Sequence, residues 1–222
     1  MYLIIVGAGD VGLKTLELAL RDQNDVVVID NDENKIDSAS SKYDCVFIHG
    51  DATIRDTLKD AEADRADAII STTADDPANM MVMLNAQDFE IPSLVSIVNH
   101  STHIRYFREL GANVIGDPDE LIAEYLYRAM QKPSVKNYMK LTKGAEVFEI
   151  TVTEDSPIIE KTLEEAANRN LIDEETIILA IDREGKLLTP KGDTKFLKGD
   201  LVTVFSQKGA KKEITKVFTG EE

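Results

Sequence analysis

The sequence has one cysteine, few basic residues and no long apolar run, and each shortage limits what the protein can be. Cys45 is the single cysteine among 222 residues, so a disulfide framework within the chain is excluded. Its apolar neighbours Val46 and Phe47 predict a packing role in a strand and a reducing compartment. The apolar runs are too short to span a bilayer, and the chain starts directly on a strand pattern rather than a signal peptide. We therefore expect a soluble, cytoplasmic protein with no direct membrane insertion.

Positive charge is scarce. The chain carries 25 Lys and Arg against 41 Asp and Glu, a formal net charge of −16. Residues 1–132 hold 24 acidic and 11 basic residues, whereas residues 133–222 hold 17 and 14. Nucleic-acid binding requires clustered Lys and Arg to neutralise phosphates, so we expect no nucleic-acid partner. Direct adsorption to anionic lipid is disfavoured for the same reason, and an acidic surface that serves only solubility explains the charge equally well.

Motifs for catalysis and metal binding are also lacking. The sequence contains no nucleophile elbow, P-loop or metal-ligand spacing. His49 lies in a strand-end turn, while His100 and His103 lie in a polar loop and a helix start without an evident orienting partner. Two acidic clusters offer an alternative, a divalent-cation site: Asp30, Asp32 and Glu33, and Asp75 with Asp76. Acids in the first turn of a helix are, however, typical complements of its dipole. The sequence therefore predicts no catalytic residue and no metal site.

The most informative pattern lies in the first thirty residues. Residues 2–6, YLIIV, form an apolar run typical of a parallel strand that is buried on both faces. Gly7-Ala8-Gly9-Asp10-Val11-Gly12 follows, and then come apolar residues at helical spacing. A second apolar run, residues 26–29, ends in Asp30. Strand, glycine turn, helix, strand and acid in this order form the dinucleotide-binding fingerprint.

Each part of this fingerprint has a physical role. Gly7 permits a backbone conformation that a Cβ would forbid, Gly9 allows the backbone to approach a pyrophosphate, and Gly12 lets the helix pack closely on the strand. The N–H groups and positive dipole end of the helix attract phosphates. Asp30 is placed to accept hydrogen bonds from ribose hydroxyls and to repel a 2′-phosphate, which favours NAD or an adenosine ligand over NADP. The alternative is a fold that keeps its glycines only for the turn.

Apolar runs of strand length continue to alternate with helical patterns through residue 116. The further runs are residues 45–48, 66–72, 94–98 and 111–115. This alternation predicts the α/β class with a doubly wound parallel (Rossmann-type) sheet.

Ligands of such sheets bind beyond the carboxyl ends of the strands, so four loops are expected to converge. These loops are residues 7–12, 30–35, 51–53 and 73–75. Helix capping by Asp51 or Thr53, and turn chemistry at residues 73–75, explain two of the loops equally well.

The pattern changes at Lys132-Pro133-Ser134, where proline ends a helix that starts near Asp117 and a polar stretch follows. Strands are expected at residues 147–152, 177–181 and 201–205, with a turn and helix from residue 156, a hairpin at 183–186 and a helix at 210–217. Strands joined by short turns with helices beside them predict a small α+β C-terminal lobe. We therefore predict two domains, residues 1–132 and residues 138–222.

Longer motifs occur in both lobes. They are IIVGAGDVG, VVVID, HGDAT and GANVIGDPDEL in the first, and SPIIEKTLEEA and AIDREGKLLTPKGDTKFLKGDLVTVF in the second. With these motifs nearly the whole chain resembles the RCK family (regulator of potassium conductance, also called KTN), specifically the TrkA-type potassium-uptake regulatory subunits with their TrkA-N and TrkA-C lobes. The resemblance implies a cytosolic nucleotide sensor, not an enzyme, whose ring lies under the inner face of the cell membrane and gates a membrane potassium transporter or channel.

The resemblance also implies site residues and ligands. Gly7, Gly9, Asp10, Val11 and Gly12 would surround phosphates, and Asp30 would hold the ribose. Asn31 would belong to the same cofactor site, and Lys35 would either reach a phosphate or the ribose or be simply an exposed lysine. Asp51, Ala52 and Thr53 would flank the base, and Thr73, Ala74 and Asp75 would close the site. The expected cofactor is NAD(H), with an adenine mononucleotide (ADP, ATP or AMP) as the alternative. The apolar stripe of residues 122–130 would pair neighbouring subunits of a homo-oligomer, a dimer or a higher ring.

The chain departs from the family at one position, and other functions stay open. Many relatives have an arginine near the end of the fifth strand, where this chain reads Ser96-Ile97-Val98-Asn99-His100. The glycine fingerprint alone is also compatible with an NAD-dependent oxidoreductase, although hydride transfer would require a proton donor and a substrate lobe. A third interpretation is an interaction scaffold whose cleft no longer binds a ligand.

Overall fold

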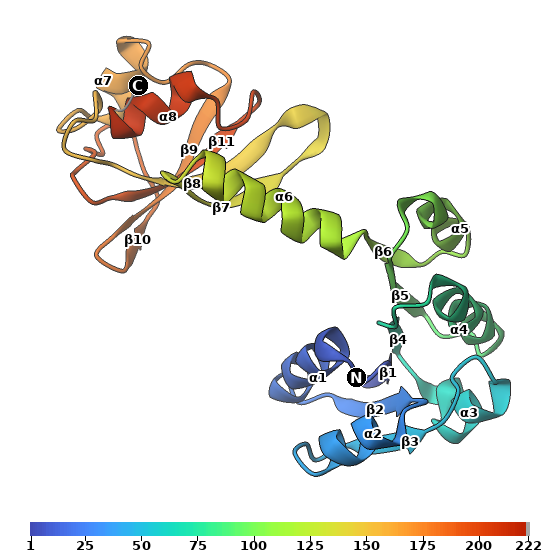
Figure 1. Cartoon of the computed structure of the whole chain (residues 1–222). Helices are drawn as coiled ribbons and strands as arrows, with labels where there is room; N and C mark the ends of the chain where they lie inside the picture. Colours follow the sequence, from blue (N-terminus) through green and yellow to red (C-terminus); the bar gives the residue numbers. More distant parts are fainter. Residues whose placement is uncertain (221–222) are drawn as a thin grey trace. The chain divides into compact units, whose positions relative to one another are not determined.

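The computed structural model describes residues 1–220, and the chain divides into two compact units, Met1–Ile122 and Ala123–Glu222 (Figure 1). Helix α6 (Pro118–Gln131) runs across this division. The sequence assigns the whole of this helix to the first lobe, and the domain limits 1–132 and 138–222 stay a prediction. Within residues 1–220, no helix is both long enough and apolar enough to cross a membrane.

The first unit is built on a parallel sheet with the strand order β3-β2-β1-β4-β5-β6. Its strands are β1 (Tyr2–Val6), β2 (Asp25–Asp30), β3 (Val46–His49), β4 (Ala68–Ser71), β5 (Ser93–Val98) and β6 (Asn113–Gly116). Val6, at the end of β1, pairs with Ile29 of β2 on one side and with Ser71 of β4 on the other. The strand order therefore reverses beside β1, which is where doubly wound sheets bind their ligands. The predicted fold of this unit is confirmed.

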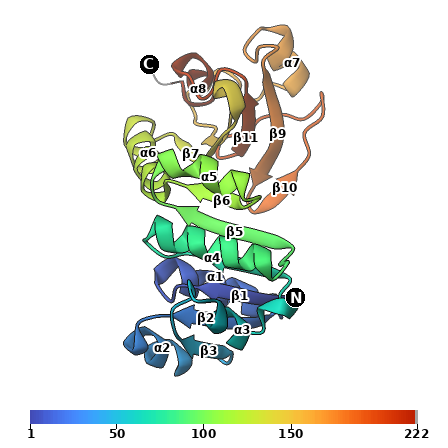
Figure 2. The same cartoon turned by 90° about the vertical axis from the view of Figure 1, so that its right-hand side faces the viewer.

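Helices cover the sheet from both sides (Figure 1). Helices α1 (Asp10–Arg21) and α2 (Glu33–Ser40) cover one face. Helices α3 (Arg55–Asp60), α4 (Asp76–Asp88) and α5 (Ile104–Glu109) cover the other, and Figure 2 views the sheet from their side. Short 3₁₀ turns, η1 (Ala63–Arg65) and η2 (Ser101–His103), precede β4 and α5. Alternate residues of β1 serve the two cores: Ile5 packs with Leu16 of α1, and Ile4 with Met83 of α4, all of them fully buried.

The second unit is an antiparallel sheet with helices, in the order β10-β9-β11-β8-β7. Its elements are β7 (Val135–Lys140), η3 (Thr142–Gly144), β8 (Glu146–Thr151), α7 (Leu163–Asn168), β9 (Thr176–Arg183), β10 (Lys186–Leu188), β11 (Leu201–Ser206) and α8 (Lys212–Thr219). Phe148, Phe196 and Phe218 are fully buried in its core. The predicted α+β character of this lobe is confirmed. Arg183 pairs with the buried carboxylate of Asp200 through two 2.8 Å hydrogen bonds, which ties the end of β9 to the start of β11.

Strand β7 is an element that the sequence analysis missed. The residues after Pro133 were predicted to be a polar stretch, but Val135–Lys140 form an edge strand paired with β8. The pairing register shifts between Lys136 and Tyr138. Only Val135 and Tyr138 contact the core, while the residues around them are exposed. A bulged edge strand has no regular alternation of buried and exposed residues, so its sequence resembles a linker.

Candidate nucleotide-binding site

A cavity of about 490 Å³ opens in the first unit at the carboxyl ends of β1, β2 and β4. Its volume lies in the usual range for small-molecule sites. The sequence-predicted residues that line it are Gly7, Gly9, Asp30, Asn31, Lys35, Asp51, Ala52, Thr53, Thr73, Ala74 and Asp75. The four predicted loops therefore converge on one cavity.

Three predicted site residues do not line the cavity, and six residues that line it were not predicted. Asp10, Val11 and Gly12 are not lining residues: Asp10 and Val11 are exposed on the first turn of α1, and Gly12 is buried against the preceding turn. The lining residues that were missed are Val6, Ile29, Gly50, Thr72, Ala78 and Val82. Val6 is the last residue of β1 and Ile29 is the residue before the end of β2, so their places beside the loops were a usable signal. Ala78 and Val82 belong to α4, and they reach the cavity only through the packing of that helix on the sheet.

The glycine turn brings the start of α1 to the cavity. Gly7 has a φ of +103°, a region that side chains disfavour, and a Cβ on Gly12 would lie 1.8 Å from the Gly7 carbonyl oxygen. Gly9 is different, because a Cβ there would meet no atom of the described residues within 4 Å other than those of Gly9 and its two neighbours in the chain. The first helical hydrogen bond runs from Leu13 N–H to the Gly9 carbonyl (2.9 Å), so the N–H groups of residues 10–12 precede it. This helix end combines unpaired donor positions with open space in front of Gly9.

The carboxylate of Asp30 is fixed at the end of β2. Asp30 is only 8% exposed, and Ala8 N–H donates to its Oδ2 at 2.6 Å while Asp32 N–H donates to its Oδ1 at 2.9 Å. Lys35 Nζ lies 3.9 Å from Oδ2 on a half-exposed side chain. Each carboxylate oxygen therefore holds one backbone donor and keeps capacity for another.

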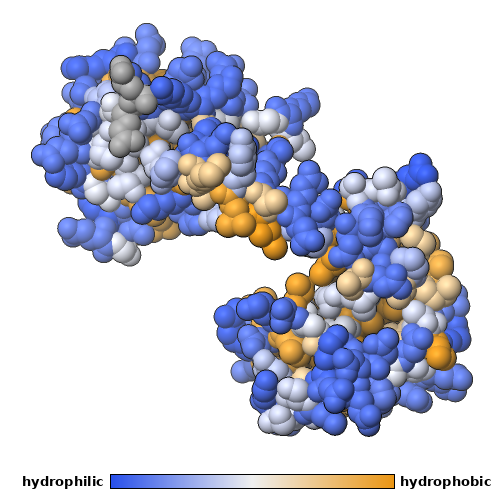
Figure 3. Space-filling model, viewed as in Figure 1, coloured by the Kyte–Doolittle hydropathy of each residue, from blue (hydrophilic) through white to orange (hydrophobic). Residues whose placement is uncertain are grey.

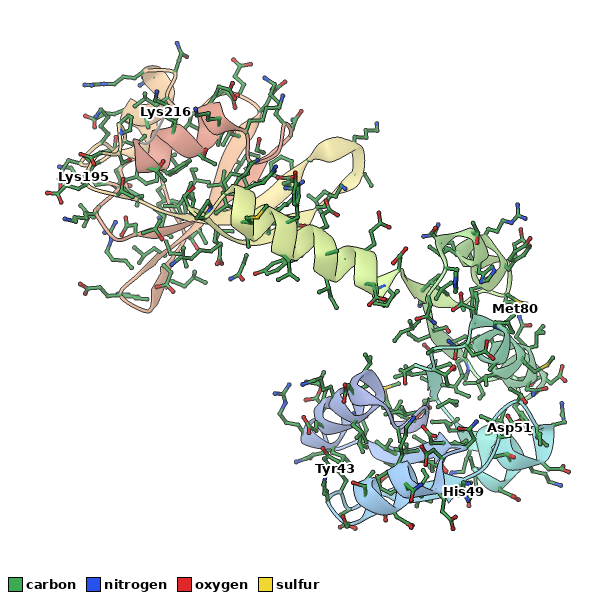
Figure 4. All side chains as sticks on the ribbon, viewed as in Figure 1. Tyr43, His49, Asp51, Met80, Lys195 and Lys216 are labelled. Carbon is green, nitrogen blue, oxygen red and sulfur yellow. The ribbon has the colours of Figure 1, made fainter. Side chains whose placement is uncertain are left out.

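The loop between β3 and α3 is closed by its own side chains. The N–H and the hydroxyl of Thr53 both donate to Asp51 Oδ1, at 2.9 and 2.7 Å. Capping of α3 by Asp51 or Thr53 is wrong: Ile54 is the N-cap, and in the described chain no side chain caps this helix. Asn31 and His49 join the neighbouring loops, since His49 Nε2 lies 3.2 Å from the Asn31 carbonyl oxygen. Figure 4 labels His49 and Asp51, which lie at the end of β3 and on the segment after it.

Residues 73–75 form another wall of the cavity. The buried side chain of Asn79 on α4 holds this wall in place. Asn79 Oδ1 accepts hydrogen bonds from the hydroxyls of Ser71 (2.7 Å) and Thr73 (2.6 Å). Its Nδ2 donates to the carbonyls of Thr73 (2.9 Å) and Ile97 (3.2 Å). One fully buried amide thus joins the ends of β4 and β5 to the cavity wall, and all its hydrogen-bonding groups are used. The hydroxyl of Thr73 takes part in this turn chemistry while the residue lines the cavity.

Asp76, the first residue of α4, holds the segment that follows β5. Its Oδ1 accepts from Asn99 N–H (2.7 Å) and Asn99 Nδ2 (2.9 Å), and its Oδ2 accepts from His100 N–H (2.9 Å). His100 Nδ1 and His103 Nδ1 also lie 3.2 and 2.8 Å from Oδ2. Burial alone would raise the pKa of Asp76, but these hydrogen bonds, from the Asn99 backbone and from His103 above all, lower it to about 2. The expectation that His100 and His103 have no orienting partner is wrong: the partner is Asp76, which precedes both of them by more than twenty residues.

Comparison with known proteins places the chain in a family. A family model described as the TrkA-N domain matches residues 3–118, more than half of the chain, and one described as the TrkA-C domain matches residues 147–219. The chain belongs to the TrkA family. A "Trk system potassium uptake protein TrkA homolog" from Methanothermobacter thermautotrophicus is 29% identical, over 99% of this chain and 100% of the relative. The protein of the same name from Pyrococcus abyssi is 27% identical, over 98% of this chain and 97% of its own.

Solved structures share the fold of this TrkA-family chain. The "GsuK channel bound to NAD" matches with a TM-score of 0.68 at 17% identity, over 98% of this chain and 39% of that chain. "GsuK bound to ADP" matches with a TM-score of 0.52 at 26% identity, over 60% of this chain and 34% of that chain. The TrkA-N and TrkA-C matches agree with the division of the structure into a parallel-sheet unit and a smaller antiparallel unit.

Replacement of Asp76 by asparagine should make stability depend less on pH. The folded pKa of about 2 lies below the unfolded value of about 4, so the carboxylate stabilises the fold above pH ~4 and this contribution is lost as the pH falls towards ~2. We expect Asp76→Asn to lower the free energy of unfolding by about 2 kcal/mol at pH 7 and by much less at pH ~2.5. Urea unfolding followed by circular dichroism at both pH values measures the difference.

The matched control for this prediction is Asp75→Asn, which removes the same charge from an exposed side chain one residue earlier. It should change the free energy of unfolding by no more than ~0.5 kcal/mol. If Asp76→Asn lowered the free energy of unfolding by the same amount at pH 7 and at pH ~2.5, the result would contradict the assigned role of the carboxylate.

Proposed function

We propose that this chain is a cytoplasmic regulatory subunit of membrane potassium transport, with NAD(H) or an adenine mononucleotide as its signal. The TrkA homologs named for potassium uptake match it over nearly its full length, which supports the transport role. GsuK structures with NAD and with ADP support a nucleotide as the ligand of this fold. The observation that carries the proposal is the cavity itself, in which the open face of Gly9 and the fixed carboxylate of Asp30 lie together.

The two ends of the cavity have complementary chemistry for such a ligand. Phosphate oxygens accept from the N–H groups of residues 10–12 at the start of α1, where the helix dipole also favours negative charge. The ribose hydroxyls donate to the unused acceptor capacity of Asp30. Ala52 and Thr53 flank the base, with Val82 as an apolar neighbour in the same lining. The nucleotide is bound as a signal and is not turned over.

The signal reaches the membrane through assembly with other subunits. Helix α6 exposes six large apolar or aromatic side chains: Leu121, Ile122, Tyr125, Leu126, Tyr127 and Met130. Figure 3 shows apolar side chains gathered on this helix. Isolated apolar side chains are ordinary on a surface, but such a group on one helix is typical of a protein interface. We assign this surface to a second copy of the chain in a ring under a membrane potassium transporter or channel, and nucleotide exchange changes the ring's conformation.

A methyl group at Gly9 should block the nucleotide without harming the fold. The backbone of Gly9 has a φ of −80°, which alanine also adopts, and its Cβ would enter the cavity. We expect Gly9→Ala to weaken NAD binding at least ~10-fold, because an added carbon in a close contact costs about 1–3 kcal/mol. Isothermal titration calorimetry with NAD, NADH, ADP, ATP and AMP measures the affinities, and unchanged absorbance of NADH during incubation checks that there is no turnover.

Gly192→Ala is the control, because its Cβ would make ordinary contacts 3.7 Å or more from Glu164 in the second unit. It should bind every nucleotide as the wild type does. If Gly9→Ala and wild type had the same affinities, or if no nucleotide bound to either, the cavity would not be the nucleotide site.

Loss of the Asp30 carboxylate should weaken the binding of NAD and reduce the discrimination between NAD and NADP. Two charge-assisted hydrogen bonds to ribose contribute about 3 kcal/mol together, so we expect Asp30→Ala to weaken NAD binding about 100-fold. The affinity for NADP should fall far less, because the 2′-phosphate of NADP no longer faces a negative charge in this variant. The ratio of the two dissociation constants, from calorimetry, is the quantity to compare, since simple damage to the loop would weaken both ligands alike.

Glu33→Ala serves as the control for this experiment. It removes one negative charge from an exposed position at the start of α2, outside the cavity lining. We expect its NAD to NADP ratio to equal that of the wild type. A ratio that stays unchanged in Asp30→Ala would argue against ribose recognition by this carboxylate.

A charge on the apolar surface of α6 should separate the subunits. Leu126 is 65% exposed on this helix, so Leu126→Glu should leave each subunit folded while it places an unpaired charge in the interface. Light scattering at micromolar concentration is expected to give an oligomer for the wild type and a smaller species for the variant. Leu18→Glu, at an exposed leucine of α1, is the control and should keep the wild-type mass. A monomeric wild type would count against a ring.

A further inference from the structure

Three side chains outside the nucleotide cavity form a compact group of potential metal ligands. Asp76 stands at the start of α4, and His100 and His103 follow β5. Their ligand atoms all lie within 4.8 Å of one another. None of the three residues lines the cavity of the first unit. This group is therefore a separate feature of the carboxyl edge of the sheet.

The carboxylate of Asp76 is oriented before any ligand arrives. Its side chain is 1% exposed. Three N–H groups, from the backbone and side chain of Asn99 and from the backbone of His100, fix both oxygens. A carboxylate held in this way by outer hydrogen bonds is typical of a metal ligand.

The two imidazoles approach the same oxygen atom at ligand-to-ligand distances. Asp76 Oδ2 lies 2.8 Å from His103 Nδ1 and 3.2 Å from His100 Nδ1. Ligands about 2.0–2.2 Å from one cation, at the angles of tetrahedral or octahedral coordination, are themselves about 3 Å apart. The ring centroids are 5.4 Å apart and the rings are tilted by 46°, so the two rings do not stack face to face. The Nδ1 atom of each ring faces Oδ2.

The fold does not require both rings at this oxygen. Oδ1 accepts two N–H groups of Asn99, and the two acceptor positions of Oδ2 are filled by His100 N–H and one imidazole, so the second imidazole adds a polar group to an oxygen that is already fully used. The side chains of His100 and His103 are 71% and 37% exposed. A cation therefore has an entry path, and water has room to complete its coordination.

We propose that Asp76 Oδ2, His100 Nδ1 and His103 Nδ1 form a binding site for a divalent transition-metal cation such as Zn²⁺ or Co²⁺. Imidazole suits these ions, whereas Mg²⁺ and Ca²⁺ prefer oxygen ligands. The cation occupies the place of the protons that the two Nδ1 atoms share with the carboxylate, and each neutral ring then carries its proton on Nε2. Water molecules fill the remaining positions. The site stands on its own geometry and does not depend on nucleotide binding.

The test uses the full chain after dialysis against EDTA, without nucleotide. Titration with CoCl₂, followed by its visible absorption, and with ZnCl₂, followed by calorimetry, should give one ion per chain. His100→Gln and His103→Gln should each lower the affinity at least ~10-fold, and MgCl₂ should not displace Co²⁺. Both substitutions affect partly exposed rings, so circular dichroism should show folded variants. Asp76→Asn is less suitable alone, because this carboxylate also holds the backbone.

His49→Gln is the matched control, since it removes the one other histidine of the chain. It should keep wild-type affinity and stoichiometry for Co²⁺. The proposal fails if the double variant His100→Gln/His103→Gln binds Co²⁺ as the wild type does, if His49→Gln loses binding equally, or if the wild type binds neither Co²⁺ nor Zn²⁺. Calorimetry with NAD on the same variants distinguishes failure of this site from failure of the nucleotide site.

Discussion

The hydrogen bond from Ala8 N–H to the carboxylate of Asp30 fixes the geometry on which the cavity depends. At 2.6 Å it joins the glycine turn after β1 to the last residue of the neighbouring strand, and Asp32 N–H holds the other oxygen. A buried carboxylate without donors would destabilise the fold, whereas two backbone donors satisfy it and set its orientation. The turn and the acid of the fingerprint are thus one structural unit, in which each holds the other in place.

The opposite side of the cavity is held by one amide and one carboxylate from α4. Asn79 bonds the ends of β4 and β5 to Thr73, and Asp76 holds the segment after β5. These residues are buried, so their polar groups must be satisfied within the protein. The loops at the carboxyl edge are therefore fixed by specific side chains of the protein itself. A preformed site binds with less ordering of the chain.

The sequence predicts the parts of this arrangement that are written in contiguous residues. The glycine turn, the acid at position 30 and the alternation of strands with helices specify the parallel sheet, and the carboxyl ends of its strands bring the loops together. The remaining parts depend on contacts between distant residues. Asn79 resembles an ordinary helix residue until its partners on β4 and β5 are known, and Asp76 resembles a first-turn acid until the histidines are placed.

At two further places the residue types alone did not predict the local structure, because the backbone geometry determines it. Asp51 and Thr53 have the composition of helix caps, but their side chains bond each other, and the cap falls to Ile54. Strand β7 carries a bulge at the sheet edge, so its polar residues do not alternate with apolar ones. In both cases the residue types permit two structures of similar local energy, and the tertiary contacts choose between them.

At the carboxyl edge of the sheet, the side chain of Asn99 contacts both the wall of the nucleotide cavity and the carboxylate of Asp76. Its Nδ2 donates to the Thr73 carbonyl at 3.2 Å and to Asp76 Oδ1 at 2.9 Å. Thr73 lines the nucleotide cavity and Asp76 does not, so one side chain touches both the cavity wall and the carboxylate that faces His100 and His103. Coupling between two sites requires an element whose position both can change. The Asn99 amide donates to an acceptor at each of the two sites, the Thr73 carbonyl and Asp76 Oδ1. A shift of Asp76 would therefore move one of the two acceptors that determine the position of this amide.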